Sequence, residues 1–190
     1  MRGFNLAQYE YRTFKAQQLM QQHELGALLL TTETNVRYFT GFLTRFWESP
    51  TRPWYIIIPQ SGKPIAVIPS IGEALMSKTW VEDIRTWPSP DLADDGINLL
   101  SETLNEVAKK NRVGIPSGAE THVRIPRNDL IKLTQNVNLS HDYEIVKNLR
   151  MIKSKEEIIK IEKACMIAKE AFGRVPEIAS ENIQLDEVFR

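Results

Sequence analysis

Two apolar segments joined by a short turn place the strongest limit on how this 190-residue chain can fold. WYIIIP, from Trp54 to Pro59, and PIAVIP, from Pro64 to Pro69, are both rich in β-branched side chains. The residues QSGK lie between them and include a glycine suited to a tight turn. We therefore predict a β-hairpin, and any sheet that contains this hairpin must be at least partly antiparallel.

Strand and helix patterns alternate on both sides of the hairpin. The run ALLL at residues 27–30 predicts a strand covered on both faces. Before it, a helix is expected from Leu6 to Leu25, with Asn5 as its N-cap and Gly26 ending it. The later predicted elements are strands at 83–87, 113–116 and 137–142 and helices at 96–110 and 128–135. This alternation, combined with a hairpin, favours an α/β fold with a mixed sheet flanked by helices.

Charge and cysteine content argue against several classes of protein. Lysine plus arginine and aspartate plus glutamate both total 24, and this balance gives no basic surface for nucleic acid or an anionic membrane. The single cysteine, Cys165, excludes an internal disulfide and a multi-cysteine zinc site. No apolar run reaches the roughly 20 residues of a membrane-spanning helix, and the N-terminus lacks a signal-peptide core. We therefore expect a cytoplasmic protein without nucleic-acid or membrane partners.

The pattern changes after Asp142, where charge and helical spacing replace strand-like runs. Ser154 and Glu157 form a Ser-x-x-Glu capping box, which predicts the start of a long amphipathic helix. The expected apolar stripe of this helix consists of Ile158, Ile161, Cys165, Ala168 and Phe172. A second helix is predicted from Leu185, and the chain stops inside it, as expected of a chain that has been cut.

No motif for catalysis or phosphate binding occurs in the chain. The histidines, His23, His122 and His141, are too scattered for a metal site, so each is expected to be structural or solvated. The carboxylate pairs at 94–95 and 156–157 fit helix N-termini better than an acid and base. Cys165 is expected to be a buried thiol rather than a nucleophile. The sequence therefore predicts no catalytic and no metal-ligating residue.

Residues 35–55, NVRYFTGFLTRFWESPTRPWY, combine aromatic side chains with arginine. The first part is expected to anchor a short helix and turn to the core, with Gly41 at a positive φ. This does not account for Phe46, Trp47 and Arg52, which lie in a loop interrupted by prolines. An arginine beside aromatic rings can bind a carboxylate while the rings exclude water. Phe46, Trp47 and Arg52 are therefore candidate substrate-binding residues, and a purely structural loop is the alternative.

Two motifs resemble the family of creatinase, prolidase and aminopeptidase P. GALLLTTETNVRYFTGF, residues 26–42, resembles the apolar strand and Asn-x-x-Tyr-aromatic-x-Gly-Phe turn of that family's N-terminal domain. LRMIKSKEEIIKIEKACMIA, residues 149–168, resembles the junction at which Arg-x-Ile-Lys-Ser-x-x-Glu-Ile opens the catalytic domain. The motifs stand in the family's order at compatible spacing, so the resemblance covers essentially the whole chain.

The resemblance implies a ribonuclease H-like creatinase-type domain over residues 1–149, followed over 150–190 by a linker and the opening helices of a truncated pita-bread domain. That catalytic domain usually holds two divalent metals, such as Mn, Co or Zn, through two aspartates, a histidine and two glutamates. All these positions would follow Arg190, so the chain by itself is expected to be inactive and to hold no cofactor. Arg52 is the closest match to the loop arginine that reaches the partner subunit's active site in creatinase.

Three functions are compatible with this resemblance. The first is a metal-dependent Xaa-Pro dipeptidase or aminopeptidase-like hydrolase, of which this chain is a non-catalytic half contributing to dimerisation and substrate access. The second is a creatinase-like C–N hydrolase of a small amidine, amide or compatible solute, although the insertion ESPT before Arg52 departs from the creatinase pattern. The third is a non-catalytic peptide-binding module. The implied partners are a small-molecule or dipeptide substrate and a second copy in a homodimer.

Overall fold

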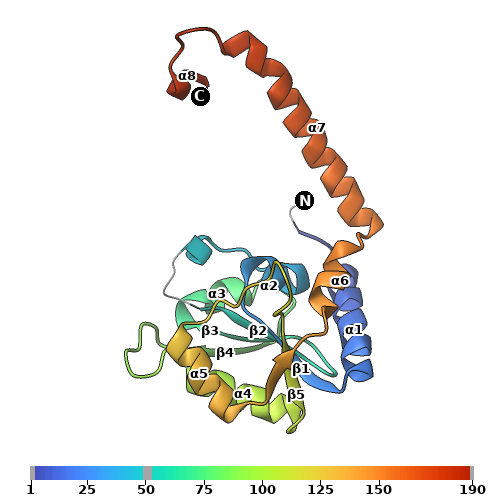
Figure 1. Ribbon diagram of the computed structural model, residues 1–190, viewed down its shortest axis with the longest axis vertical. Helices are drawn as coiled ribbons and strands as arrows, with labels where there is room; N and C mark the ends of the chain where they lie inside the picture. Colours follow the sequence, from blue (N-terminus) through green and yellow to red (C-terminus); the bar gives the residue numbers. More distant parts are fainter. Residues whose placement is uncertain (1–2, 49–52, 189–190) are drawn as a thin grey trace. The chain divides into compact units, whose positions relative to one another are not determined.

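The computed structural model describes residues 3–48 and 53–188, and the chain divides into two compact units, residues 1–151 and 152–190. In the first unit, six strands form one sheet in the order β4-β3-β2-β1-β5-β6 (Figure 1). The strands are β1 (Leu25–Leu30), β2 (Tyr55–Pro59), β3 (Ile65–Pro69), β4 (Asp83–Trp87), β5 (Arg112–Ile115) and β6 (Leu139–His141). β1, β2 and β3 form an antiparallel meander, β4 runs parallel to β3, and β5 and β6 run parallel to β1. The predicted mixed sheet is confirmed.

Helices cover both faces of the sheet (Figure 1). They are α1 (Leu6–Gln22), α2 (Glu33–Thr40), α3 (Glu73–Met76), α4 (Ile97–Ala108), α5 (Arg127–Asn136) and α6 (Ile145–Met151), with 3-10 turns η1 (Arg45–Glu48) and η2 (Ser70–Gly72). Side chains of α1, α2, α3 and α6 pack into one core, and those of α4 and α5 pack into the other. Along β1, Leu28 and Leu30 enter the first core while Ala27 and Leu29 enter the second. This two-sided burial explains why the strand is apolar at every position.

The predicted hairpin is β2 and β3, paired antiparallel with Tyr55 opposite Val67 and Ile57 opposite Ile65. The turn is fastened to α1, because the side-chain amide of Gln17 donates hydrogen bonds to the carbonyl oxygens of Pro59, at 3.0 Å, and Gly62, at 2.9 Å. A single glutamine therefore links the first helix to the central meander.

The first helix ends earlier than the sequence predicts. Asn5 is the N-cap, as expected, and its side chain accepts a hydrogen bond from the backbone N–H of Gln8. The helix stops at Gln22, however, and Glu24 has a φ of 55°. Leu25 already belongs to β1 and lies fully buried opposite β5. The prediction that the helix continues to Leu25 and ends at Gly26 is wrong, since burial of Leu25 in the sheet outweighs its helix propensity.

Gly41 closes α2 with a φ of 76°, and its N–H donates to the carbonyl oxygen of Arg37 at 2.9 Å. This left-handed C-cap confirms the positive φ expected from the sequence, and glycine adopts it at little cost. The site is also crowded, because a Cβ at Gly41 would lie 2.5 Å from the hydroxyl oxygen of Tyr9. The turn thus requires glycine for two separate reasons.

Gly41→Ala is expected to lower the free energy of unfolding by about 1–3 kcal/mol, through backbone strain and the clash with Tyr9. Gly62→Ala is the matched control, because Gly62 also has a positive φ of 90° but has no atom within 4 Å of the position that a Cβ would take. Urea denaturation followed by circular dichroism measures both variants. Equal losses in the two variants would show that the contact with Tyr9 contributes nothing.

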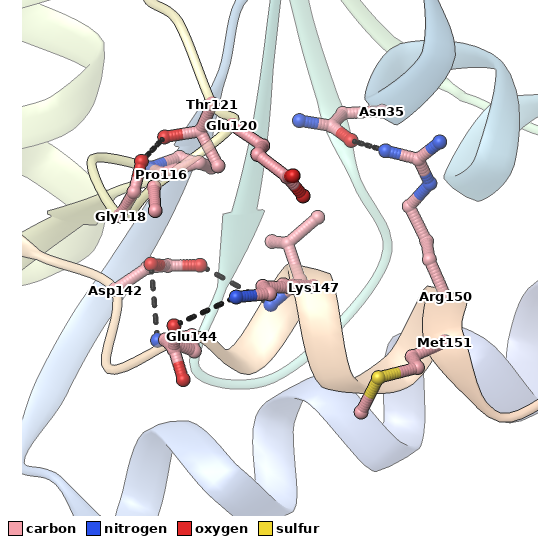
Figure 2. A pocket seen from close by; sticks show the side chains of 12 residues that line it. Asn35, Pro116, Gly118, Glu120, Thr121, Asp142, Glu144, Lys147, Arg150 and Met151 are labelled. Atoms are coloured by element: carbon pink, nitrogen blue, oxygen red, sulfur yellow. Dashed lines mark hydrogen bonds and ion pairs between the residues drawn. The ribbon is translucent and has the colours of Figure 1, made fainter.

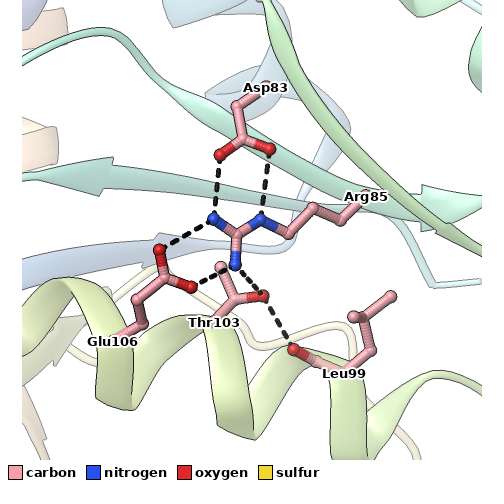
Figure 3. Close-up of polar contacts among 5 residues, drawn as sticks. All are labelled: Asp83, Arg85, Leu99, Thr103 and Glu106. Carbon is pink, nitrogen blue, oxygen red and sulfur yellow. Dashed lines mark hydrogen bonds and ion pairs between the residues drawn. The ribbon is translucent and has the colours of Figure 1, made fainter.

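An ion-pair network fastens the edge strand β4 to α4 (Figure 3). The guanidinium of Arg85 donates to both carboxylate oxygens of Asp83, at 3.1 and 2.9 Å, and contacts both carboxylate oxygens of Glu106. It also donates to the hydroxyl of Thr103 at 3.3 Å. The hydrogen bonds from Arg85 lower the pKa of Glu106. The hydrogen bonds to Glu106 and Asp83 raise the pKa of Arg85. The network lies on the face of β4 that α4 covers, so it joins the edge strand to that helix.

The second unit contains α7 (Lys155–Ile178) and α8 (Leu185–Val188). The capping box is confirmed, because the hydroxyl of Ser154 accepts from the N–H of Glu157 and the Glu157 carboxylate accepts from the N–H of Ser154. No residue of α7 is buried in the described structure. Cys165, expected to be a buried thiol, is exposed. Within the described residues, no helix is both long and apolar enough to cross a membrane.

Candidate functional site

The loop after α2 is built around Trp54. Trp54 is fully buried, and its ring centroid lies 5.4 Å from that of Phe42, 6.1 Å from that of Trp47 and 6.3 Å from that of Phe46. Gly72 also approaches so closely that a Cβ there would lie 2.1 Å from the indole ring. Trp54 therefore holds the loop, the start of β2 and η2 together.

Phe46 and Trp47 are neighbours in η1, but the structure gives them different surroundings. Trp47 is 8% exposed and belongs to the core shared by β1, β2 and β3, whereas Phe46 is 40% exposed. Phe46 stacks on Trp54, and its side chain is nevertheless partly exposed to solvent. Trp47 supports the loop from inside, and Phe46 is the aromatic ring that the loop presents.

Arg124 lies beside this aromatic cluster, although it comes from the segment between β5 and α5. Its guanidinium carbon is 5.1 Å from the ring centroid of Trp47, and its backbone N–H donates to the hydroxyl of Thr31 at 3.0 Å. Burial lowers the pKa of Arg124 and the charge of Glu33 partly opposes this, but an arginine stays charged. Sequence reasoning missed this residue, because nothing aromatic adjoins Arg124 in the sequence.

Arg52, the third candidate, lies outside the described residues. Its described neighbours Pro53 and Trp54 are both buried. Phe46 and Trp47 thus both pack on Trp54, and Arg124 places a cation against the Trp47 ring.

The histidines do not assemble a metal site. His23 stacks on Tyr143 at a centroid distance of 4.2 Å, and His141 lies 4.0 Å from the same ring. The phenol of Tyr143 accepts a hydrogen bond from Arg112. Across residues 3–48 and 53–188, no three His, Cys, Asp or Glu side chains come close enough together to hold a metal ion.

Comparison with known proteins decides the family. Residues 12–152 match the model of the creatinase/prolidase N-terminal domain, which is more than half of the chain. The chain belongs to this family. The match spans all six strands of the sheet, and the Trp54 cluster lies within this creatinase/prolidase domain.

Relatives of the creatinase/prolidase domain extend the likeness over nearly the whole chain. An uncharacterized hydrolase/peptidase, y4tM, of Sinorhizobium fredii is 24% identical over 192 residues, covering 97% of this chain and 48% of the relative. A prolidase from Thermococcus sibiricus has a TM-score of 0.77 at 22% identity, over 95% of this chain and 47% of its own. The dipeptidase PepE from Mycobacterium ulcerans has a TM-score of 0.74 at 22% identity, over 98% and 48%.

These structures confirm the predicted creatinase-type fold, a six-stranded mixed sheet flanked by helices. The chain spans about half the length of the relatives that it matches.

Proposed function

We propose that this chain is the non-catalytic N-terminal half of an Xaa-Pro dipeptidase or aminopeptidase-like hydrolase. The match of residues 12–152 to the creatinase/prolidase domain carries the proposal, together with relatives of about twice the length that are named as peptidases. Residues 150–190 are then the linker and the opening helices of the catalytic domain. The exposed stripe of α7 supports this assignment, since an amphipathic helix normally buries its apolar face.

In this proposal the loop around Trp54 contributes to substrate access in a homodimer. Phe46 presents an aromatic face, Trp47 fixes that face to the core, and Arg52 supplies a cation for a substrate carboxylate. Arg124 adds a second positive charge beside Trp47. Rings that exclude water strengthen the attraction between such a cation and a carboxylate.

The proposed peptidase would use two divalent metals. In this proposal the residues that hold them belong to the catalytic domain, outside this chain. When bound, such ions supply a hydroxide nucleophile at neutral pH. The residues of this chain contribute binding and orientation only.

Kinetics of the full-length protein test the proposal. Phe46→Ala and Arg52→Ala are each expected to raise KM for an Xaa-Pro dipeptide, or to lower kcat/KM, by about tenfold, equivalent to ~1.4 kcal/mol. Tyr11→Ala is the matched control, because Tyr11 is an exposed aromatic residue of α1 remote from the loop in sequence. The 190-residue chain alone should hydrolyse no dipeptide.

Two results would contradict the proposal. Unchanged kinetics in both loop variants would remove the loop from substrate access. Turnover of a creatine-like amidine, with no cleavage of Xaa-Pro dipeptides, would replace the peptidase by the C–N hydrolase.

A further inference from the structure

A pocket of ≈ 340 Å³ lies where β1, β5 and β6 end, and neither Trp54 nor the aromatic rings packed on it belong to its lining. These three strands are parallel, and the pocket is lined by the segments that follow them. The charged and amide side chains of its lining are Asn35, Glu120, Asp142, Glu144, Lys147 and Arg150. In open α/β sheets, ligands bind in crevices at the carboxyl ends of parallel strands. The volume falls in the range of small-molecule sites.

One wall of the pocket carries the carboxylate of Glu120. Figure 2 shows Glu120 extending from the segment after β5 into the space between that segment, α2 and α6. Glu120 forms no ion pair with any lysine or arginine in the described part of the chain. Its backbone has a φ of 63°, and the turn that carries it is closed by the hydroxyl of Thr121, which donates to the carbonyl oxygen of Gly118 at 2.6 Å. A short turn therefore directs this carboxylate into the pocket.

Helix α6 supplies two cations to the same pocket. Arg150 donates to the side-chain oxygen of Asn35 at 2.9 Å, and this bond orients its guanidinium along the pocket wall (Figure 2). Lys147 pairs with Glu144 at 3.1 Å, and both side chains are partly exposed. Exposed pairs of this kind contribute little, so the Lys147 ammonium can transfer to a ligand carboxylate at small cost.

The third acidic residue of the lining, Asp142, already has hydrogen-bond partners in the protein. The buried carboxylate of Asp142 accepts hydrogen bonds from the backbone N–H groups of Glu144, at 3.2 Å, and Val146, at 3.1 Å. Asp142 therefore shapes the start of α6 instead of binding a ligand. The charged groups that face the pocket are the Glu120 carboxylate and the Lys147 ammonium, while Arg150 is held on Asn35.

We propose that this pocket binds a small zwitterion, a free amino acid or a short peptide, with its ammonium group at Glu120 and its carboxylate at Lys147. Charges of both signs on different walls match a ligand that carries both signs. A polyanion such as a nucleotide is disfavoured, because Glu120 and Glu144 would repel it. The site lies within residues 35–151 and does not depend on the proposed peptidase activity.

Amide NMR of the ¹⁵N-labelled 190-residue protein tests the site with four probes. L-alanine and L-alanyl-L-alanine carry both charges, N-acetyl-L-alanine lacks the ammonium group, and L-alaninamide lacks the carboxylate. One or both zwitterions should cause saturable shifts in residues 116–121 and in α6 at concentrations up to ~10 mM, a weak but specific affinity. The two blocked probes should cause shifts at least fivefold smaller. The zwitterion whose shifts saturate at the lower concentration shows whether the site prefers an amino acid or a peptide.

Substitutions test which side chains bind the charged groups of the ligand. Glu120→Gln and Lys147→Met should each weaken zwitterion binding by about tenfold or more, while Glu73→Gln, an exposed acid on α3, should leave it unchanged. An unaltered amide spectrum outside the pocket shows that each variant is folded. Linear shifts without saturation for both zwitterions, or equal binding of N-acetyl-L-alanine, would overturn the proposal.

Discussion

Trp54→Ala is expected to lower the free energy of unfolding of the creatinase/prolidase domain by about 3–5 kcal/mol. The indole is fully buried and contacts three other aromatic rings, and Gly72 packs directly against it. Its removal leaves a cavity that these neighbours cannot fill without moving. Urea denaturation monitored by circular dichroism measures the loss.

Phe46→Ala is the matched control in the same cluster. Phe46 is a large aromatic residue on the same indole, but it is exposed, so its replacement should cost less than about 1 kcal/mol. Trp54→Phe should recover part of the stability, because the indole N–H of Trp54 has no hydrogen-bond acceptor among the described residues. Similar losses for Trp54→Ala and Phe46→Ala would refute the assignment of Trp54 as the centre of the cluster.

Arg12→Met is expected to lower the free energy of unfolding by about 2–4 kcal/mol. The Arg12 side chain is 3% exposed, and its guanidinium carbon lies 4.2 Å from the ring centroid of Phe4 and 4.1 Å from that of Tyr38. It donates to the backbone carbonyl of Tyr38 at 2.7 Å, one of the last carbonyls of α2 that the helix itself cannot satisfy. Methionine retains the apolar stem but leaves that carbonyl without this donor.

Arg37→Met provides the comparison, because Arg37 is an exposed arginine of α2. Its replacement is expected to change stability by less than about 0.5 kcal/mol. Thermal unfolding followed by circular dichroism compares the two variants at equal net charge. A loss in Arg12→Met no larger than in Arg37→Met would show that the stacked arginine does not fasten α1 to α2.

In the candidate loop, some features could be predicted from neighbouring residues in the sequence and others could not. Aromatic residues beside prolines and arginines marked residues 35–55 as unusual, and Phe46 does present an exposed ring there. Trp47, its neighbour in sequence, is buried instead. Arg124, the cation that packs on Trp47, comes from the segment between β5 and α5. No pattern within the loop could indicate a contact with a segment so distant in the chain.

The zwitterion pocket could not be predicted for the same reason. Its lining comes from α2, from the segment after β5, from the residues after β6 and from α6. Taken alone, each of these segments resembles an ordinary capping or turn sequence. Glu144 and Lys147 resemble a solvent-exposed ion pair on a helix. Only the parallel pairing of β1, β5 and β6 brings these groups around one space.

Elements whose causes are local could be predicted from the sequence. The β-branched runs 54–59 and 64–69 form the predicted hairpin, the capping box at Ser154 opens α7, and Gly41 has its positive φ. Two motifs were also sufficient to indicate the family. The tertiary structure alone decided which face of each segment is buried and which distant residues meet, because burial depends on the packing of several elements at once. Hydrogen bonds, caps and turn geometry act over a few residues, whereas the surroundings of Trp47, Arg124 and Glu120 depend on the complete sheet.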